Sequence, residues 1–177
     1  MSQLAEGARP ERITTERLVL RKIVPEDVDA MVALHADPDA VRHRPEGLRG
    51  AEHSTRLFSA WLDHWNEFGF GYWALELVGT KELVGFGGLQ MASDDWAGTY
   101  LNVFYRLFPE FWGRGYAPEM VVAAVEWGRR VYPHLPIFII TPTVNVSARR
   151  VAEKVGFIQV REAFFQGAVN CFFRSPG

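Results

Sequence analysis

The chain has 177 residues, 48% of them hydrophobic, so it has the length of one ordinary domain and enough apolar side chains for a single core. Its 19 Lys and Arg residues nearly balance its 21 Asp and Glu residues, and the net charge of −2 argues against a nucleic-acid or membrane-surface partner. The single cysteine, Cys171, excludes an internal disulfide and a multi-cysteine metal site. We therefore predict one cytoplasmic domain over residues 1–177, with no bound metal.

The N-terminal third of the chain predicts one strand and two helices. Residues 1–13 are expected to be a flexible N-terminus, and the polar segment to Arg12 lacks the apolar core of a signal peptide. Thr15–Arg21 alternates as a strand does, and Pro25–Asp27 then begins a helix with acidic residues in its first turn. After a charged loop, a second helix is predicted over Ala51–Phe68. Its apolar residues recur at helical spacing: Leu57, Phe58, Trp61, Leu62 and Trp65.

The middle of the chain predicts a meander of three antiparallel strands. Tyr72–Val78 and Glu82–Leu89 flank a glycine-containing turn, as in a hairpin. The second of these strands contains three glycines, at positions 85, 87 and 88, which indicate a bulge or a close approach of another backbone. The polar segment Gln90–Thr99 is predicted to be a connection, and it leads to an aromatic and branched strand at Tyr100–Phe108.

The C-terminal part predicts a crossover followed by closing strands. A helix over Pro118–Arg130 links the aromatic strand to the continuous apolar run Ile137–Thr141, so these two strands should be parallel. A short helix is predicted over Ala148–Val155, with Ser147 as its N-cap. Two strands, at 157–160 and 170–173, are expected to close the sheet, and the aromatic tail residues are expected to belong to the core. The fold class predicted from these elements is α/β (α+β).

The stretch from Phe111 to Glu119 has the features of an anion site. Gly113 and Gly115 allow a tight turn and a close backbone approach to a ligand, because neither has a Cβ. The turn lies between a strand and a helix whose first turn accommodates Pro118 and is favoured by the charge of Glu119. Unpaired N–H groups at a helix N-terminus bind phosphates, so residues 113–117 are predicted to hold a pyrophosphate.

Two motifs together resemble the GNAT superfamily of N-acetyltransferases. Trp112–Ala117 resembles the pyrophosphate loop of a branch that includes the ribosomal-protein N-terminal (RimJ/RimL-like) acetyltransferases. Asn145 with Arg149–Phe157 resembles the second cofactor motif of that branch. The resemblance covers about residues 14–173 and implies a mixed, mostly antiparallel sheet flanked by helices and splayed at one point. It also implies transfer of an acetyl group from acetyl-CoA to an amine by direct attack.

The resemblance assigns cofactor-binding roles to particular positions. The backbone near Arg106, Leu107 and Phe108 would pair with the pantetheine arm, and Asn145 would bond to the same arm. Arg114 and either Arg149 or Arg150 would meet the adenosine phosphates. The complete set of predicted cofactor residues is Arg106, Leu107, Phe108, Trp112, Gly113, Arg114, Gly115, Tyr116, Ala117, Asn145, Arg149 and Arg150.

The catalytic positions depart from the family pattern. Relatives often carry a glutamate base where this chain has Asn102, and a serine where it has Ala148. An amide cannot accept a proton at neutral pH and alanine can donate none. Tyr105, Asn102 and Ser147 are the predicted catalytic set, with Tyr105 as a donor to the leaving thiolate. The other candidates for acid–base work are Glu76, Asp94, Asp95, His43 and His53.

Two further hypotheses follow from the same residues. Asn102 and Ala148 are compatible with an acyl-CoA-binding sensor or interaction module that has little activity. A P-loop or Rossmann nucleotide site is disfavoured, because no Gly-Lys-Ser/Thr follows the turn and a meander precedes it. The sequence leaves open whether the acceptor is a protein N-terminus or a small amine, and whether the chain forms a homodimer.

Overall fold

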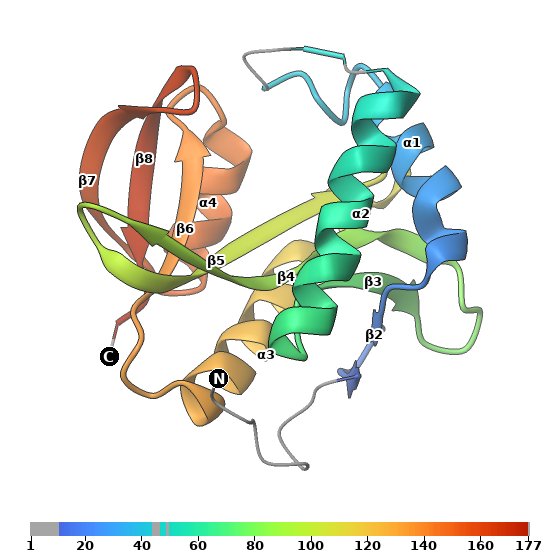
Figure 1. Ribbon diagram of the computed structural model, residues 1–177, viewed down its shortest axis with the longest axis horizontal. Coiled ribbons are helices and arrows are strands. Elements are labelled where there is room, and N and C mark those ends of the chain that lie inside the picture. The colour runs from blue at the N-terminus through green and yellow to red at the C-terminus, as the bar shows by residue number, and fades with distance from the viewer. Residues whose placement is uncertain (1–10, 44–46, 49, 177) are drawn as a thin grey trace.

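The structure is a computed structural model that describes residues 11–43, 47–48 and 50–176. Its strands form one eight-stranded sheet in the order β1-β2-β3-β4-β5-β6-β8-β7 (Figure 1). The strands are β1 Arg12–Thr14, β2 Leu18–Lys22, β3 Tyr72–Leu77, β4 Leu83–Asp94, β5 Gly98–Leu107, β6 Ile137–Pro142, β7 Ile158–Phe165 and β8 Ala168–Arg174. The helices are α1 Val28–Ala36, α2 Ala51–Phe68, α3 Tyr116–Val131 and α4 Val146–Lys154, with short 3-10 turns at Pro25–Asp27 and Pro109–Phe111.

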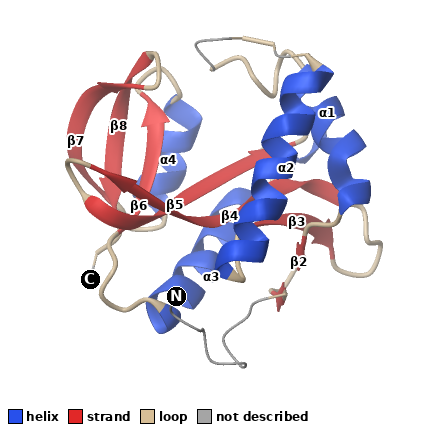
Figure 2. Ribbon diagram, viewed as in Figure 1, coloured by secondary structure: helices blue, strands red, loops and turns tan. Residues whose placement is uncertain are grey.

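Helices cover both faces of the central strands, with α2 in front of them and α3 behind in Figure 2. Trp61 of α2 contacts the rings of Tyr72 and Phe104, at centroid distances of 5.0 and 5.5 Å. On the opposite face Gly128 lets α3 approach closely, because a Cβ there would lie 2.8 Å from the Leu89 side chain. The core therefore lies on both faces of strands β3 to β6.

The predicted fold class and the main helices are confirmed. Neighbouring strands are antiparallel except β5 and β6, which are parallel as the crossover through α3 predicted. Helix α2 has the predicted bounds, Ala51–Phe68. The glycines of β4 also have the predicted role: Gly85 lies next to an irregularity of the ladder, and a Cβ on it would lie 2.2 Å from the Arg106 carbonyl oxygen.

Three local predictions were wrong. The segment Gln90–Thr99 is not only a connection, because β4 continues to Asp94, whose side chain accepts the amide hydrogens of Trp96 and Ala97 to form the turn. The N-cap of α4 is Asn145 and not Ser147, since Asn145 Oδ1 accepts from the Ala148 amide at 3.1 Å.

The third wrong prediction concerns the first strand. The chain turns at Thr15, whose amide donates to the Leu18 carbonyl, so the predicted strand at Thr15–Arg21 begins only at Leu18. The N-terminus expected to be flexible lies outside the described residues at 1–10, and Arg12–Thr14 forms β1.

None of the described helices is both long and apolar enough to cross a membrane.

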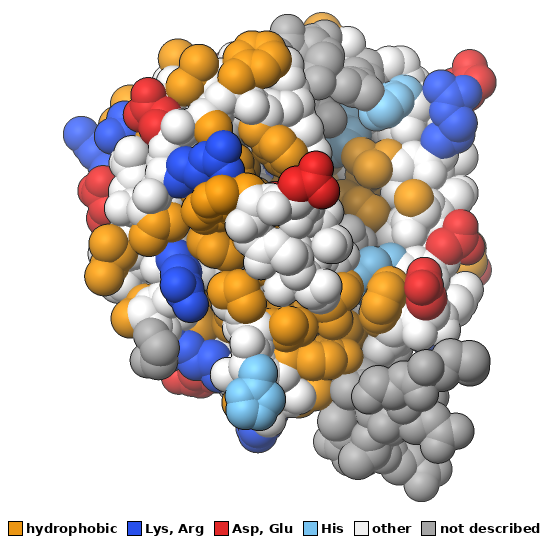
Figure 3. Space-filling view, turned by 60° about the vertical axis from the view of Figure 1, so that its left-hand side comes forward, with side chains coloured by type: hydrophobic (Ala, Val, Ile, Leu, Met, Phe, Trp, Pro, Cys, Tyr) orange, Lys and Arg blue, Asp and Glu red, His pale blue; other side chains and the backbone are white. Residues whose placement is uncertain are grey.

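The prediction that the aromatic tail belongs to the core is confirmed for β8 but wrong for Phe164, because β7 is the edge strand of the sheet. Phe172 and Phe173 are buried, whereas Phe164 on the edge strand β7 is 76% exposed. Figure 3 views the molecule from this side and shows hydrophobic side chains spread over the face. The exposed hydrophobic residues of β7 are Ile158, Val160 and Phe164.

Candidate functional site

The parallel strands β5 and β6 separate partway along their length. Their pairing covers only Leu101–Val103 against Ile137–Ile139, although β5 continues to Leu107 and β6 to Pro142. Beyond the paired part, β4 holds β5 and β8 holds β6, and the two strands diverge in Figure 1. Among the residues that the structure describes, β6 pairs with this edge of β5 only at Leu101–Val103, so the part of the edge that faces the gap is a template for an extended ligand.

A cavity of about 1120 Å³ opens at this gap. One wall comes from β5, the loop after it and the first turn of α3, and another comes from β6 and α4. The rest of the lining comes from α1 with the residues that follow it, from α2, from β3 and β4, and from the β7–β8 hairpin. The volume suits a long ligand together with a second molecule.

Most predicted site residues meet at this cavity. The predicted residues that line it are Asn102, Tyr105, Arg106, Leu107, Trp112, Gly113, Gly115, Tyr116, Ala117, Asn145, Ser147 and Arg150. Phe108, Arg114 and Arg149 do not line it. Arg114 lies over the Phe111 ring instead, and Arg149 donates to the Thr143 carbonyl at 3.3 Å.

The loop before α3 has the geometry of an anion cradle. Gly113 and Gly115 have φ values of +72° and +81°, which L side chains rarely adopt. Tyr116 and Ala117 then begin α3, and the first amide groups of a helix have no intrahelical acceptor. Trp112 fixes the start of the loop, because its indole nitrogen donates to the Leu107 carbonyl at 2.9 Å. The loop therefore presents N–H donors and the positive end of a helix dipole to the cavity.

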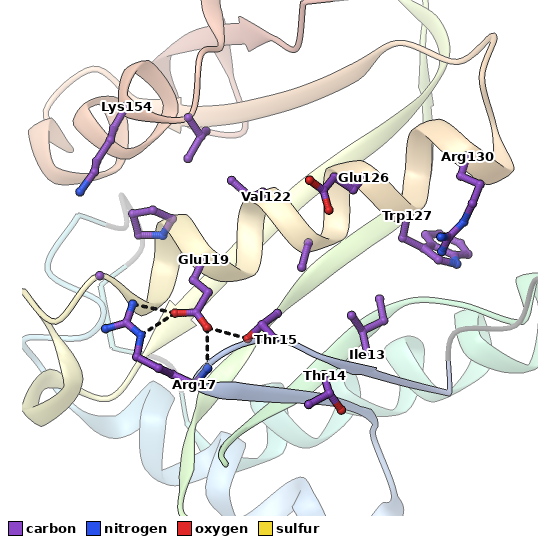
Figure 4. A pocket seen from close by; sticks show the side chains of 14 residues that line it. Ile13, Thr14, Thr15, Arg17, Glu119, Val122, Glu126, Trp127, Arg130 and Lys154 are labelled. Carbon is purple, nitrogen blue, oxygen red and sulfur yellow. Dashed lines mark hydrogen bonds and ion pairs between the residues drawn. The ribbon is translucent and has the colours of Figure 1, made fainter.

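A network of hydrogen bonds and an ion pair connects α3 and the glycine loop to the turn at Thr15–Leu18, as Figure 4 shows for Thr15, Arg17 and Glu119. Glu119 in α3 accepts hydrogen bonds from Thr15 Oγ1 at 2.6 Å and from the Arg17 amide at 2.9 Å. The Arg17 guanidinium pairs with the other Glu119 oxygen and also donates to the Arg114 carbonyl at 2.7 Å. Burial raises the pKa of Glu119, but hydrogen bonds from Thr15 and Arg17 outweigh it, so the pKa lies below its ordinary value.

Tyr105 and Asn102 reach the cavity from opposite faces of β5, because they are an odd number of residues apart in one strand. The Tyr105 phenol is buried and has no hydrogen-bond partner among the described residues. Burial raises its pKa well above the ordinary value, so it stays protonated near neutral pH. Asn102 donates its amide to the Tyr72 phenol oxygen at 2.9 Å.

Of the remaining acid–base candidates, His43 alone lines the cavity. Glu76 forms an ion pair with Arg21 at 2.6 Å, which holds β2 to β3. Asp94 and Asp95 belong to the β4–β5 turn and His53 lies in α2, and none of the three lines the cavity. The pKa of His43 is lowered by burial and by the neighbouring Arg42.

Several cavity residues have no counterpart in the sequence predictions. Tyr72, Gln90 and Trp61 line the cavity together with the buried His35, whose Nδ1 lies 3.1 Å from Ser54 Oγ. Gln90 lies directly opposite Asn102 in the β4–β5 ladder, and its amide nitrogen is buried with no partner among the described residues. The sequence does contain a signal that could have placed Gln90 in a strand. The apolar residues at 91–92 directly after it extend the strand pattern beyond the predicted end at Leu89.

The chain matches known acetyltransferases in sequence and in fold. The family model described as Acetyltransferase (GNAT) domain matches residues 17–158. The uncharacterized N-acetyltransferase YoaA of Bacillus subtilis is 25% identical over 146 residues, which cover 82% of this chain and 81% of that protein.

Solved acetyltransferase structures share the fold, and two of them illustrate the likeness. An acetyltransferase from Agrobacterium tumefaciens superposes with a TM-score of 0.81 at 23% identity, covering 94% of each chain. RimL, a ribosomal alpha-N-protein acetyltransferase in complex with coenzyme A, gives a TM-score of 0.72 at 16% identity, covering 93% of this chain and 97% of that chain.

Proposed function

This chain belongs to the GNAT acetyltransferase family as an acetyl-CoA-dependent N-acetyltransferase, and we propose that it acetylates a primary amine in the cavity between β5 and β6. The observation that carries the proposal is one cavity that joins the edge of β5 where β6 diverges from it to a glycine loop at a helix N-terminus. An acyl-CoA combines an extended amide-containing arm with a pyrophosphate, so its two parts match these two features. The coenzyme A complex of the RimL structure supports this choice of ligand.

The residues present fit the cofactor. The edge of β5 at Arg106 and Leu107 would bond to the amides of the pantetheine arm, and the amide groups of residues 113–117 would hold the pyrophosphate. Asn145 would bond to the arm from α4 through its side-chain nitrogen, because its oxygen already accepts from Ala148. Arg150 is an exposed cation at the cavity, placed to meet the adenosine phosphates.

Bound acetyl-CoA would supply an acetyl thioester for direct attack by the amine. Tyr105 would donate its phenolic proton to the sulfur as the C–S bond breaks, since its hydroxyl is buried, protonated and unpaired among the described residues. The proton that the attacking nitrogen loses as the C–N bond forms would return to the Tyr105 oxygen, so the phenol ends neutral. Asn102 cannot take a proton from the amine, so the acceptor has to arrive in its neutral form. Its side-chain oxygen would orient the amine through an N–H bond, because its nitrogen is already bonded to Tyr72.

The acceptor side of the cavity is mainly aromatic and carries few charges. Trp61, Tyr72 and Phe104 contact one another there, with Gln90 and Asn102 as neighbouring polar groups. Asp39 is the only carboxylate among the described residues that line the cavity. We keep both acceptor classes, a protein N-terminus and a small-molecule amine, within the proposal.

The proposal is tested by measuring coenzyme A binding by calorimetry and thiol release from acetyl-CoA with a panel of amines. The expected result is saturable binding together with amine-dependent thiol release and an acetylated product in mass spectrometry. If the chain does not bind coenzyme A at millimolar concentration, the proposal is wrong.

A second candidate function is an acyl-CoA-binding sensor or interaction module. Asn102 and Ala148, which stand where relatives carry a base and a serine, favour it. Tight binding of acetyl-CoA without turnover on any amine would support this candidate over the enzyme.

The cellular location and the assembly state also stay proposals. We propose a cytoplasmic protein, and we keep the homodimer as the assembly to test. The exposed hydrophobic residues of β7 are the surface on which a second copy would bury apolar area. Light scattering with a Phe164→Asp variant tests this, because a dimer through β7 should become monomeric.

A further inference from the structure

We propose that Arg17 is a positioning residue for acetyl-CoA, which holds the glycine loop in the conformation that binds the pyrophosphate. The inference rests on the proposed function, since it assigns the loop at residues 112–117 to the cofactor. Arg17 lies behind the loop and contacts a second cavity, of about 670 Å³, on the far side of α3 (Figure 4). It does not line the cavity between β5 and β6. Its role is therefore indirect and acts through the backbone of the loop.

The first contact fixes the direction of one peptide group. Arg17 Nη1 donates to the Arg114 carbonyl oxygen at 2.7 Å, which pulls this oxygen toward the rear of the loop. In a planar trans peptide the C=O and the following N–H point in opposite directions. The N–H that follows belongs to Gly115, which borders both cavities. Holding the carbonyl at the rear therefore directs the Gly115 N–H to the front, where the pyrophosphate would lie.

The second contact removes a competing negative charge. Glu119 lies in the first turn of α3, where an unpaired carboxylate would repel a phosphate at the same helix terminus. Four donors occupy its oxygens: Thr15 Oγ1 and the Arg17 amide on one, and Arg17 Nε and Nη2 on the other, at 2.6 to 2.9 Å. These bonds keep the carboxylate turned to the rear of α3.

The planar guanidinium suits this place better than an ammonium group. It bonds to Arg114 and Glu119 at once, and it lies 4.9 Å from the centroid of the Tyr116 ring. A Cβ on Gly115 would lie 3.3 Å from Arg17 Nη2, so the glycine allows the guanidinium to pack directly against the loop. A lysine has its three N–H donors on one nitrogen, so it cannot reproduce the planar fork that reaches the Arg114 carbonyl and the Glu119 carboxylate at once.

The test compares the Arg17→Met variant with the unmutated protein, using acetyl-CoA and S-acetylpantetheine as acetyl donors. Arg17→Met should raise the Kd of coenzyme A and the KM of acetyl-CoA about tenfold, while kcat and the KM of the amine change little. S-acetylpantetheine lacks the pyrophosphate, so its kcat/KM, or its inhibition constant if it is not turned over, should be equal in both proteins. Arg17→Lys should recover little of the affinity.

Arg130→Met is the matched control, because Arg130 lines the same rear cavity at the other end of α3. This substitution should leave the Kd of coenzyme A, both KM values and kcat unchanged. If Arg17→Met does not fold, Glu119→Gln tests the same network, with the thermal midpoint recorded alongside. Unchanged coenzyme A affinity in a folded variant would overturn the proposal, as would equal losses with both donors. Failure of the unmutated chain to bind coenzyme A would instead refute the proposed function.

Discussion

Asn102 on β5 donates its side-chain amide to the phenol oxygen of Tyr72 on β3, at a distance of 2.9 Å. The bond crosses β4, which lies between these two strands in the sheet, and it joins residues 30 positions apart in the sequence. It fixes the orientation of the amide, so that its oxygen is the atom left to meet an acceptor amine. Neither partner accepts a proton near neutral pH, because burial raises the pKa of Tyr72 far above its ordinary value.

The pH dependence of the reaction should therefore follow the acceptor and not the enzyme. We expect the rising limb of kcat/KM to have an apparent pKa near 8 for a peptide α-amine and near 10 for an alkyl amine, about the values of the free amines. The measurement is a pH profile of kcat/KM with each acceptor. His43→Gln is the control and should leave both profiles in place, since His43 lines the cavity but is not assigned as the base. A single pKa shared by both acceptors would instead reveal a base on the enzyme.

Tyr105→Phe should separate catalysis from stability. Loss of the proton donor is expected to lower kcat about 100-fold. The same change removes a buried hydroxyl that has no partner among the described residues, so the free energy of unfolding should stay equal or rise by up to about 1 kcal/mol. Urea unfolding and steady-state kinetics measure the two effects. Tyr132→Phe, at the C-terminal end of α3, is the control and should leave kcat unchanged. If Tyr105→Phe also left kcat unchanged, Tyr105 would not be the proton donor.

The Glu119 network should make the protein sensitive to acid. The pKa of Glu119 is lowered in the folded protein from an ordinary value of 4.5, so the unfolded state binds more protons between these two values. The free energy of unfolding should therefore fall as the pH drops below 4.5 toward the folded pKa. Glu119→Gln should flatten this part of the profile and cost about 1 kcal/mol at pH 7. The control Glu126→Gln, at an exposed position of the same helix, should keep the slope of the unmutated protein.

Gly85→Ala should disturb the strand that is proposed to pair with the cofactor. Gly85 has a φ of +150°, and a Cβ on it would lie 2.2 Å from the Arg106 carbonyl oxygen and 2.7 Å from the Leu107 Cα. Both obstacles are backbone atoms, so the strands have to move apart. We expect a loss of about 3 kcal/mol in the free energy of unfolding, measured in urea. Gly50→Ala is the control: no atom lies within 4 Å of the added Cβ, so the free energy of unfolding should fall by less than about 1 kcal/mol. Similar losses of this free energy in both variants would contradict the steric explanation.

The sequence by itself determined the elements whose signals are local. The helical spacing of α2 gave its bounds, and the apolar run at Ile137–Thr141 after a helix predicted the parallel pair β5 and β6. The glycine loop before α3 was also identified, because a left-handed backbone at Gly113 and Gly115 requires glycine wherever the rest of the chain lies. Signals of this kind depend on a few neighbouring residues, and tertiary contacts rarely override them.

Contacts between distant segments were decided only by the tertiary structure. Thr15 and Glu119 are 104 positions apart, and nothing near either residue indicates that Arg17 reaches the back of the loop. The position of Gln90 opposite Asn102 required the true end of β4 at Asp94 and the register of the β4–β5 ladder. Side-chain periodicity says which residues share a face of a strand, but register and strand order decide which of them meet at one cavity.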